Sequence, residues 1–324
     1  MKNVQHMQVG PDDDGQRLDR WLKKQGIPFA IIQKMIRTGQ VRVDGKRAKA
    51  DTRLAEGQDV RLPPREEKIK GAPYKLTEKD AAFINGLVIY DEGGIIAINK
   101  PAGIASQGGS NISRHIDGML PALSKKKDNT PKLIHRLDRD TSGILLIARN
   151  TNMARRMGRV FADRNIRKIY WALCAPTPEQ PEGKIAYPLR KGEGPQKDKM
   201  IVDPIDGQAS TTLYEVIENA GDKAAFVAFW PRTGRTHQIR AHAAAAGFPL
   251  LSDEKYGIPT DALDGMDIAP RLHLHAAEIT FRHPETNKWV TIRAPLPSDI
   301  STTWKAFGFD TKAKSVKAFA DTEM

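Results

Sequence analysis

Short apolar segments of strand length dominate residues 86–307 and constrain the fold more than any other feature of the chain. The segments predicted as strands are 94–99, 143–148, 168–174, 211–217, 225–230, 272–281 and 289–292. Of these, 211–217 and 225–230 alternate like half-buried antiparallel strands. Helices are predicted at 151–164, with Thr151 as N-cap, and at 236–246, ended by Gly247. Strands with so few helices between them favour an α+β fold with a mostly antiparallel mixed sheet over a doubly wound parallel sheet.

Residues 15–63 are expected to form a smaller, strongly basic αβ unit ahead of this sheet. Twelve Lys and Arg stand against five Asp and Glu there, so the segment holds +7 of the chain's net charge of +12. Two short helices are predicted from apolar residues at helical spacing, which are Leu18, Trp21 and Leu22 in the first and Ile31 or Ile32, Met35 and Ile36 in the second. Gly39 can end the second helix. Asp44-Gly45 predicts a tight turn between the alternating segments 41–43 and 60–62, and hence a small sheet.

The composition of the remaining chain predicts a polar N-terminal tail, a linker, a larger compact region and a C-terminal tail. Residues 1–14 are expected to be a polar tail, and Pro63-Pro64 begins a charged, proline-interrupted linker over 64–85. The larger compact region then covers 86–307. The Lys-rich tail, 308–324, lacks a strong apolar period and is expected to fray.

The positive charge makes a polyanion the first partner to consider. In the small unit, the cations Lys34, Arg37, Arg42, Lys46 and Arg47 fall on or just after the second predicted helix. They form either an ordinary solvated face or a surface that contacts nucleic-acid phosphates.

Several classes of protein are excluded or disfavoured. No apolar run approaches the roughly 20 residues of a membrane helix, and the N-terminus has no apolar core of a secretory signal. The single cysteine, Cys174, excludes an internal disulfide framework. We therefore expect a cytoplasmic protein with no membrane contact.

The densest polar cluster lies at residues 135–143, HRLDRDTSG, directly before a strongly apolar strand. This placement predicts a loop delivered to the edge of a sheet, where active sites are common. Asp138 and Asp140 lie between Arg136 and Arg139, and a neighbouring arginine keeps a carboxylate ionised. An ionised, partly desolvated carboxylate can act as a nucleophile. A surface loop of salt bridges explains the same composition.

Two further features carry candidate chemistry. Arg235 lies between Gly234 and the helix predicted to begin at Thr236. A helix N-terminus with an arginine can bind a phosphate or a carboxylate. Simple helix capping with a solvated arginine is the alternative. Tyr170 lies on a predicted strand, where it is either part of the core or a stacking platform for a base.

Metal and nucleotide-cofactor chemistry have little support. His237 and His242 are five residues apart, which does not stack two ligands on one helix face, and His273 and His275 lack an obvious third ligand. The glycine-rich segment 108–110 lacks the lysine and spacing of a P-loop, and no dinucleotide-binding fingerprint occurs. We expect no metal and no cofactor.

Four segments together resemble a known family. HRLDRDTSG at 135–143 resembles the signature of the RluA-type pseudouridine synthases, and its companions are NKPAG at 99–103, the Lys168-x-Tyr170 piece and GRTHQIR at 234–240. Residues 15–63 resemble an S4 RNA-binding domain. The segment 100–110, KPAGIASQGGS, is similar to the branch of large-subunit rRNA synthase C.

The resemblance implies residue roles. Asp138 would attack the uridine at C1′ or at the base, after which the uracil rotates and rejoins through C5. Tyr170 would stack on the flipped base and assist removal of the C5 proton, and Arg235 would pair with Asp138. Arg136 would enter the RNA where the nucleotide leaves, and Leu272 or Leu274 would form the apolar wall under the base. The resemblance thus implies a catalytic set of Asp138, Tyr170 and Arg235 and a substrate-binding set of Arg136, Leu272 and Leu274.

The resemblance leaves the substrate open. An isomerase acting on 23S rRNA is the first interpretation, a related synthase acting on tRNA or another rRNA site is the second, and a non-catalytic RNA-binding protein is the third. The isomerisation itself needs no nucleotide, redox cofactor or metal. A monomer is expected.

Overall fold

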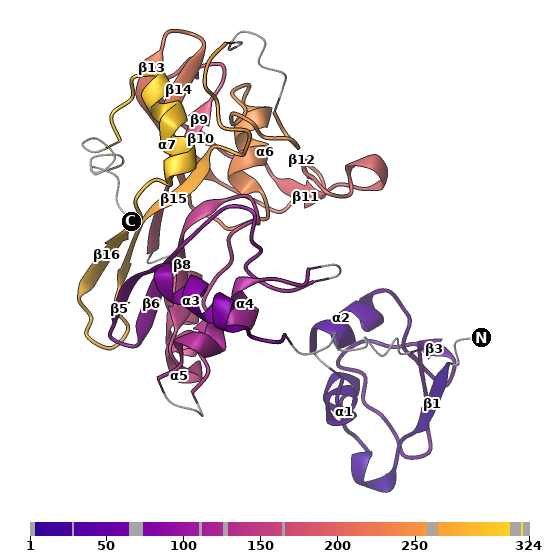
Figure 1. Cartoon of the computed structure of the whole chain (residues 1–324). Helices are drawn as coiled ribbons and strands as arrows, with labels where there is room; N and C mark the ends of the chain where they lie inside the picture. The colour runs from indigo at the N-terminus through magenta and orange to yellow at the C-terminus, as the bar shows by residue number, and fades with distance from the viewer. Residues whose placement is uncertain are drawn as a thin grey trace. The chain divides into compact units, whose positions relative to one another are not determined.

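The computed structural model divides the chain into two compact units, Met1–Pro73 and Tyr74–Met324 (Figure 1). Each unit is described by itself. The residues that the structure describes are 4–27, 29–64, 74–109, 112–125, 129–163, 166–257, 263, 265–311 and 319. Residues 65–73 of the predicted linker and most of the C-terminal tail, together with Ser110 and Arg164, lie outside these residues.

The smaller unit packs two helices on a four-stranded antiparallel sheet. Its elements are β1 (Gln5–Gln8), a 3-10 turn (Pro11–Asp13), α1 (Leu18–Lys24), α2 (Phe29–Arg37), β2 (Arg42–Val43), β3 (Lys46–Arg47) and β4 (Asp59–Leu62), with strand order β1-β4-β2-β3. Leu18, Trp21 and Leu22 are buried, as their spacing predicts. In α2, Ile32 and Met35 are buried and Ile36 is partly buried, whereas Ile31 is 45% exposed.

The turns of this unit confirm the glycine predictions. Asp44 and Gly45 both have positive φ, +47° and +74°, which is the conformation of a tight two-residue hairpin turn. Gly39, with φ of +67°, follows α2. A Cβ at this position would lie 2.9 Å from Arg47 Nε, so the flexible end of the Arg47 side chain would have to shift.

The segment expected as a polar tail is part of the fold, so that prediction is wrong. β1 pairs with β4 from Gln5 opposite Leu62 to Gln8 opposite Asp59. Asp13 accepts hydrogen bonds from Trp21 Nε1 and Lys24 Nζ at 3.0 and 2.7 Å. The partners of β1 lie far along the chain, and the polar residues of the segment gave no periodic signal.

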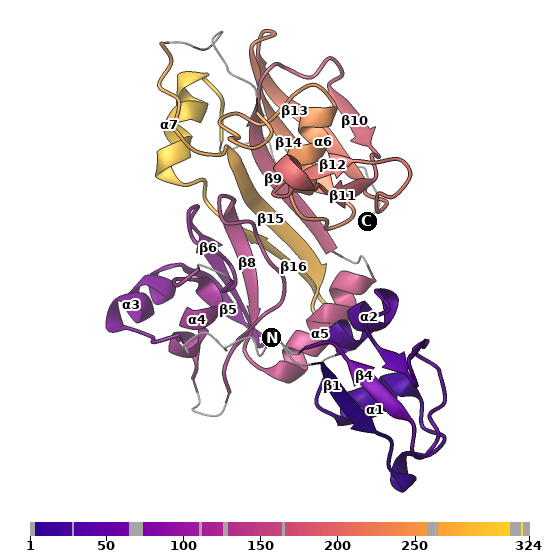
Figure 2. The same cartoon turned by 90° about the vertical axis from the view of Figure 1, so that its right-hand side faces the viewer.

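The larger unit is built on one mixed sheet in which only β8 and β15 run parallel among the paired strands described (Figure 2). The strand order is β10-β13-β14-β9-β15-β8-β6-β5, with β16 paired to β15 and β7 to β8. Their bounds are β5 (Val88–Glu92), β6 (Ile95–Lys100), β7 (Lys132–Leu133), β8 (Ser142–Ala148), β9 (Ile166–Cys174), β10 (Glu182–Ile185), β13 (Thr212–Ala220), β14 (Ala224–Pro231), β15 (Leu274–Arg282) and β16 (Trp289–Arg293). This arrangement confirms the predicted α+β class and mostly antiparallel sheet.

Helices cover both faces of this sheet. On the half built from β9 and β14, α6 (Gln238–Ala245) packs on one face and α7 (Ser298–Ala306) on the other. On the half built from β6 and β8, α5 (Thr151–Ala162) lies opposite α3 (Glu78–Gly86), α4 (Ile116–Met119) and the 3-10 turn Leu120–Leu123. β14 is therefore buried along its whole length rather than half-buried as predicted.

Several element boundaries differ from the predictions. The side chain of Asn150, not Thr151, caps α5 by accepting a hydrogen bond from Met153 N at 2.8 Å. α6 begins at Gln238, two residues later than predicted, because His237 adopts a left-handed conformation with φ of +49°. α3 occupies residues predicted as linker, since Thr77 caps it and Ile84 is buried. Phe309 and Phe319 of the predicted tail join the core around Trp230.

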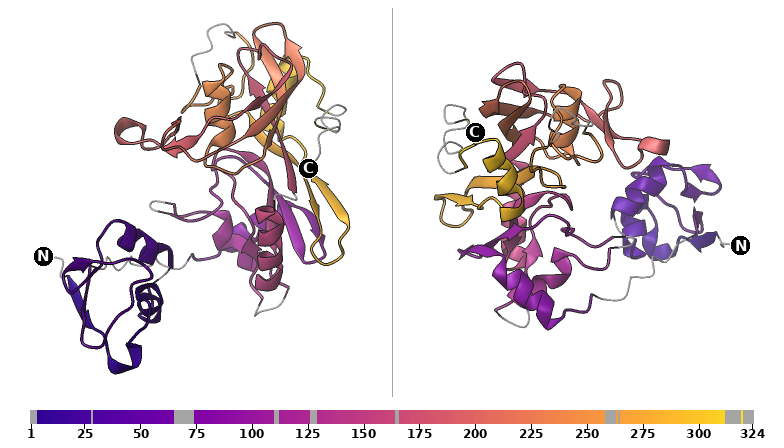
Figure 3. Two further views of the ribbon diagram at one scale, coloured as in Figure 1. Left: turned by 180° about the vertical axis from the view of Figure 1, so that it is seen from behind. Right: turned by 45° about the horizontal axis from the view of Figure 1, so that its top comes forward.

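A separate two-stranded hairpin, β11 (Leu189–Lys191) and β12 (Met200–Val202), extends from the larger unit beside α6 (Figure 3). Its turn contains the 3-10 helix Gly194–Gln196. The sequence patterns above did not predict this hairpin.

Candidate active site

The loop at 135–142 is fixed by main-chain contacts. Ser106 Oγ accepts from Leu137 N at 3.0 Å and donates to Leu137 O at 2.7 Å. Asp138 O accepts from Thr141 N at 3.2 Å, which closes a turn around the aspartate. Gly143 then enters β8 with φ of +113°, where a Cβ would lie 2.3 Å from Ala276 O. Only glycine allows β8 and β15 to approach at this point.

Lys100 anchors the same loop from the neighbouring segment. Its buried Nζ donates to the carbonyls of Pro101, Ile104 and Arg139 at 2.9, 2.9 and 3.1 Å. Gly103 N also donates to Arg139 O at 2.9 Å. Burial lowers the pKa of Lys100 to about 7, against the opposing charges of the nearby carboxylates. The NKPAG segment thus positions the backbone directly after Asp138, a role that sequence reasoning missed.

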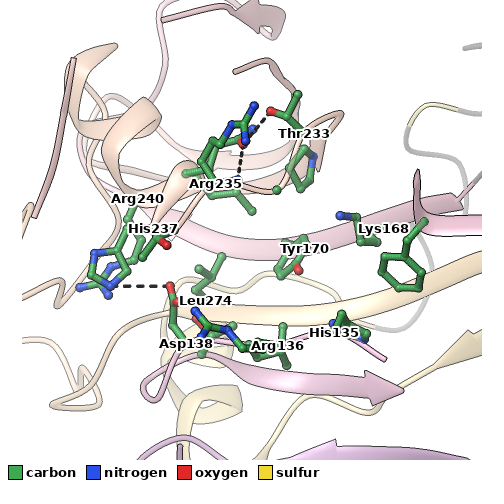
Figure 4. Close-up of a pocket in the computed structure, with 18 residues that line it drawn as sticks. His135, Arg136, Asp138, Lys168, Tyr170, Thr233, Arg235, His237, Arg240 and Leu274 are labelled. Carbon is green, nitrogen blue, oxygen red and sulfur yellow. Dashed lines mark hydrogen bonds and ion pairs between the residues drawn. The ribbon is translucent and has the colours of Figure 1, made fainter. Parts of the chain in front are cut away.

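A cavity of about 290 Å³ opens above this loop (Figure 4). Asp138 and Arg136 come from the loop, Tyr170 from β9 and Leu274 from β15, and residues 231–240 supply the opposite wall. The structure therefore brings all but one of the predicted site residues of the larger unit to one cavity. Leu272 is the exception, because it is buried in the core beneath α6 and does not line the cavity.

Asp138 is the one carboxylate among the described residues that line this cavity. Its side chain is 30% exposed, and Oδ2 lies 3.9 Å from His237 Nε2. His237 Nδ1 lies 2.9 Å from Tyr256 Oη, which accepts a hydrogen bond from Met200 N at 2.6 Å. Burial lowers the pKa of His237, and the charge of Asp138 opposes that effect. A neutral ring can accept the Tyr256 proton at Nδ1, and in that tautomer its Nε2–H faces Asp138.

Arg235 does not reach Asp138 in this structure. Its guanidinium donates to Ala209 O at 3.4 Å, and Figure 4 shows it beside Thr233, away from the aspartate. Arg240 is the buried guanidinium of this wall, with a bidentate pair to Asp253 at 2.7 and 2.6 Å. Burial lowers the pKa of Arg240, but the hydrogen bonds and charge of Asp253, with a contribution from Asp138, raise it overall. In this structure the charge of Arg240 acts on Asp138, and the pairing of Arg235 with Asp138 stays a prediction.

Tyr170 faces the cavity from the middle of the sheet. It pairs with Phe229 of β14 and Ala276 of β15. Burial raises the pKa of Tyr170, and the negative charge of Asp138 adds to the effect. The phenol is therefore neutral at neutral pH.

Lys168 and His135 form a second pair of groups on the cavity wall that the sequence did not single out. The Lys168 ammonium lies 5.9 Å from the centre of the Phe161 ring, and the His135 ring stacks on the same phenylalanine at 5.3 Å. His135 Nε2 accepts from Leu146 N at 3.0 Å. Burial, with the charge of Lys168, lowers the pKa of His135 to about 3, so His135 is a neutral structural residue.

Three of the four histidines considered as metal ligands, His242, His273 and His275, are hydrogen-bonded within the core. His242 contacts Ser210, Thr212 and the Tyr187 carbonyl, and His275 contacts Ser142 and the Ala294 carbonyl. No three metal-ligating side chains come together within the described ranges.

The five predicted RNA-binding cations of the smaller unit are all exposed. Lys34 and Arg37 lie on α2, Arg42 on β2, and Lys46 and Arg47 on β3. Arg47 donates to Arg37 O at 2.8 Å, which joins the end of α2 to the hairpin. In the described part of this unit, none of the five is paired with a carboxylate.

Comparison with known proteins agrees with this geometry. A model of the RNA pseudouridylate synthase family matches residues 94–245, and a model of the S4 domain matches residues 16–60. The ribosomal large subunit pseudouridine synthase C of Vibrio parahaemolyticus is 36% identical over 305 residues, which cover 92% of this chain and 94% of that protein. The chain belongs to the RNA pseudouridylate synthase family.

Further relatives support the same assignment. The synthase C of Escherichia coli is 34% identical over 91% of this chain and 93% of its own length. The human protein RNA Pseudouridylate Synthase Domain Containing 4 shares the fold with a TM-score of 0.60 at 24% identity, covering 71% of this chain and 97% of that one. The predicted family, its N-terminal S4 domain and the synthase C branch are thus confirmed. The protein is a pseudouridine synthase, an isomerase. In the part of the chain that is described, no helix is long and apolar enough to cross a membrane.

Proposed function

We propose that this pseudouridine synthase modifies uridines in 23S rRNA of the large ribosomal subunit, with Asp138 as its nucleophile. The observation that carries the catalytic part is the position of Asp138, which is the one carboxylate among the described lining residues and is surrounded by cationic side chains. The names of the relatives, which refer to the large ribosomal subunit, support the choice of RNA. A ribosomal substrate is consistent with the expectation of a cytoplasmic enzyme.

The reaction is balanced without a co-reactant. Asp138 attacks the uridine at C1′ or at the base, the C1′–N1 bond breaks, the uracil rotates, and a C1′–C5 bond forms. The bond from Asp138 to the nucleotide breaks as the product forms, which frees the carboxylate, and the C5 proton is lost while N1 gains one. The flipped uridine must leave its stack, which costs a few kcal/mol. We propose that Arg136, exposed at the mouth of the cavity, fills the space that the nucleotide leaves.

Tyr170 and Leu274 are proposed to hold the uracil ring between them. A neutral phenol offers a stacking face, and Leu274, 3% exposed, offers an apolar wall. Since the raised pKa of Tyr170 keeps its proton in place, we assign stacking as its first role. A part in removing the C5 proton would require the phenol oxygen to pass its own proton on.

The S4 domain is proposed to bind RNA through Lys34, Arg37, Arg42, Lys46 and Arg47. Their exposure and the lack of carboxylate partners in the described structure support contact with phosphates. We keep the expectation that the enzyme is a monomer and needs no metal or cofactor.

The test of this proposal is the Asp138→Asn variant. Asparagine has nearly the same shape but cannot act as an anionic nucleophile, so pseudouridine formation should be abolished while RNA binding persists. Asp140→Asn is the matched control, because Asp140 lies in the same loop but does not line the cavity. Carbodiimide-stable stops mapped on 23S rRNA and on tRNA report both activity and substrate. Activity within about tenfold of the parent in Asp138→Asn would contradict the assignment, and stops on tRNA alone would contradict the substrate.

A further inference from the structure

A second hollow adjoins the catalytic cavity beneath the β11–β12 hairpin. Its volume is about 560 Å³, compared with about 290 Å³ for the catalytic cavity. Thr236 and His237 line both, so the two hollows meet at the residue that faces Asp138. Figures 1 and 2 both show β12 beside α6, the helix that follows this shared wall.

The hollow has an excess of positive charge. Its cations are Arg190, Lys191, Lys197, Lys199 and Lys255, and its carboxylates are Asp198 and Asp206. Arg190 is neutralised by ion pairs with Asp203 and, at 3.6 Å, with Glu193. The described structure pairs none of the four lysines with a carboxylate.

The lysines come from three separate stretches of the chain. Lys191 is the last residue of β11, and Lys197 and Lys199 precede β12. Lys255 comes shortly after Asp253, the partner of Arg240. Lys255 Nζ donates to Asp198 O at 3.2 Å, which fixes this lysine against the hairpin. Like charges gathered on a concave surface repel one another, and a bound anion offsets that repulsion.

We propose that this lysine-lined hollow binds the phosphates of the nucleotides that flank the target uridine. The inference rests on the proposed function. An RNA strand whose uridine has entered the catalytic cavity must continue past the rim of that cavity, and the shared residues Thr236 and His237 mark where the lysines begin. A solvated lysine face would explain the composition but not its concave shape or its junction with the catalytic cavity.

The hairpin is also tied to the catalytic carboxylate. Met200 N on β12 donates to Tyr256 Oη, which contacts His237 Nδ1, and His237 Nε2 faces Asp138. The hairpin that is proposed to bind RNA is therefore connected, through Tyr256 and His237, to the side chains around the nucleophile.

The test compares two triple variants of equal charge. One carries Lys191→Gln, Lys197→Gln and Lys199→Gln. The control carries the same change at three exposed lysines that do not line the hollow, Lys223, Lys288 and Lys305. RNA affinity is measured on a 23S rRNA fragment between about 50 and 200 mM salt, because each lost phosphate contact lowers the slope of log affinity against log salt by about 0.7–0.9.

The hairpin variant should lose about two to three units of slope and about tenfold or more in affinity at low salt, whereas the control should change little. Equal changes in affinity and slope in both variants would show that only the overall positive charge of the protein affects RNA binding, and would overturn the proposal. A loss confined to the saturated single-turnover rate, with unchanged affinity and slope, would overturn it as well.

A second measurement locates the contact on the RNA. Oligonucleotides with one neutral methylphosphonate linkage, placed in turn on each side of the target uridine, should bind the parent more weakly at one or more positions. At those positions the hairpin variant should be insensitive, because the two changes remove the same interaction. Full sensitivity in the variant would contradict the proposal. If the parent binds this RNA but forms no pseudouridine in it, the proposed function fails while the binding comparison still reports on the hollow.

Discussion

Arg240 offers the sharpest test of how the cavity is built. It is 3% exposed and makes two hydrogen bonds to Asp253, whose side chain is fully buried. Removing one member of a buried ion pair leaves an uncompensated charge and typically costs about 3–5 kcal/mol. Arg240→Met should therefore lower the free energy of unfolding by that amount. Arg235→Met, in the same segment, should cost less than about 1 kcal/mol because the Arg235 side chain is exposed.

A double variant separates the structural role of Arg240 from its electrostatic role. Asp253 Oδ1 also accepts from Lys255 N and Tyr256 N at 2.9 and 3.1 Å. In the Arg240→Met/Asp253→Asn double variant, the introduced asparagine keeps an oxygen for these donors but has no charge. We expect most of the lost stability to return, by the logic of a double-mutant cycle. The single-turnover rate should stay about a hundredfold low, since the positive charge near Asp138 is gone.

Urea denaturation and single-turnover pseudouridine formation, both measured on the parent and the three variants, decide the matter. If Arg240→Met costs no more stability than Arg235→Met, the reasoning from the buried pair is wrong. If the double variant regains both stability and rate, the charge of Arg240 has no part in the chemistry.

Two further predictions follow from groups buried around the cavity. Lys100→Met should lower the single-turnover rate about 10–100-fold, because the Arg139 carbonyl beside Asp138 loses its anchor and a small misplacement of a catalytic group is costly. Lys305→Met, the control, should leave this rate unchanged. Burial lowers the pKa of His273 and His275 to about 4 in the folded state, so the unfolded chain binds more protons between about pH 4 and 6.5. Each histidine should therefore remove up to about 3 kcal/mol of stability as pH falls through that range, and urea midpoints that do not change between about pH 7 and 4.5 would contradict this.

Local sequence patterns predicted what local interactions determine. Leu18, Trp21 and Leu22 form the buried face of α1, and Asp44-Gly45 forms a tight turn, because in both cases the responsible residues are neighbours in the chain. The motif at 135–143 likewise predicted a loop before a buried strand. Its companion at 99–103 was recognised only as part of a family pattern, since the contact of Lys100 with Arg139 spans 39 residues.

The positions of Arg235 and Arg240, the two arginines of GRTHQIR, could not be predicted from the sequence. Helical spacing counted from Thr236 leaves the directions of Arg235 and Arg240 undetermined. The left-handed residue His237 moves the start of α6 to Gln238, which places Arg235 outside the helix. Arg240 is then directed to Asp253, thirteen residues further on, in a turn that no periodic pattern marks. The positive charge near Asp138 could be expected from the sequence, but not which arginine provides it.

The arrangement around Asp138 explains how its carboxylate stays available for attack. A bidentate arginine would occupy both oxygens, but Arg240 gives its two donors to Asp253 and acts on Asp138 only through its charge. His237 Nε2, at 3.9 Å, is beyond a normal hydrogen bond in the free enzyme. When a uridine fills the cavity and displaces water, the effective dielectric falls and the attraction of both groups for the carboxylate strengthens. The same event that brings C1′ or the base to Asp138 therefore also strengthens the attraction of Arg240 and His237 for the carboxylate.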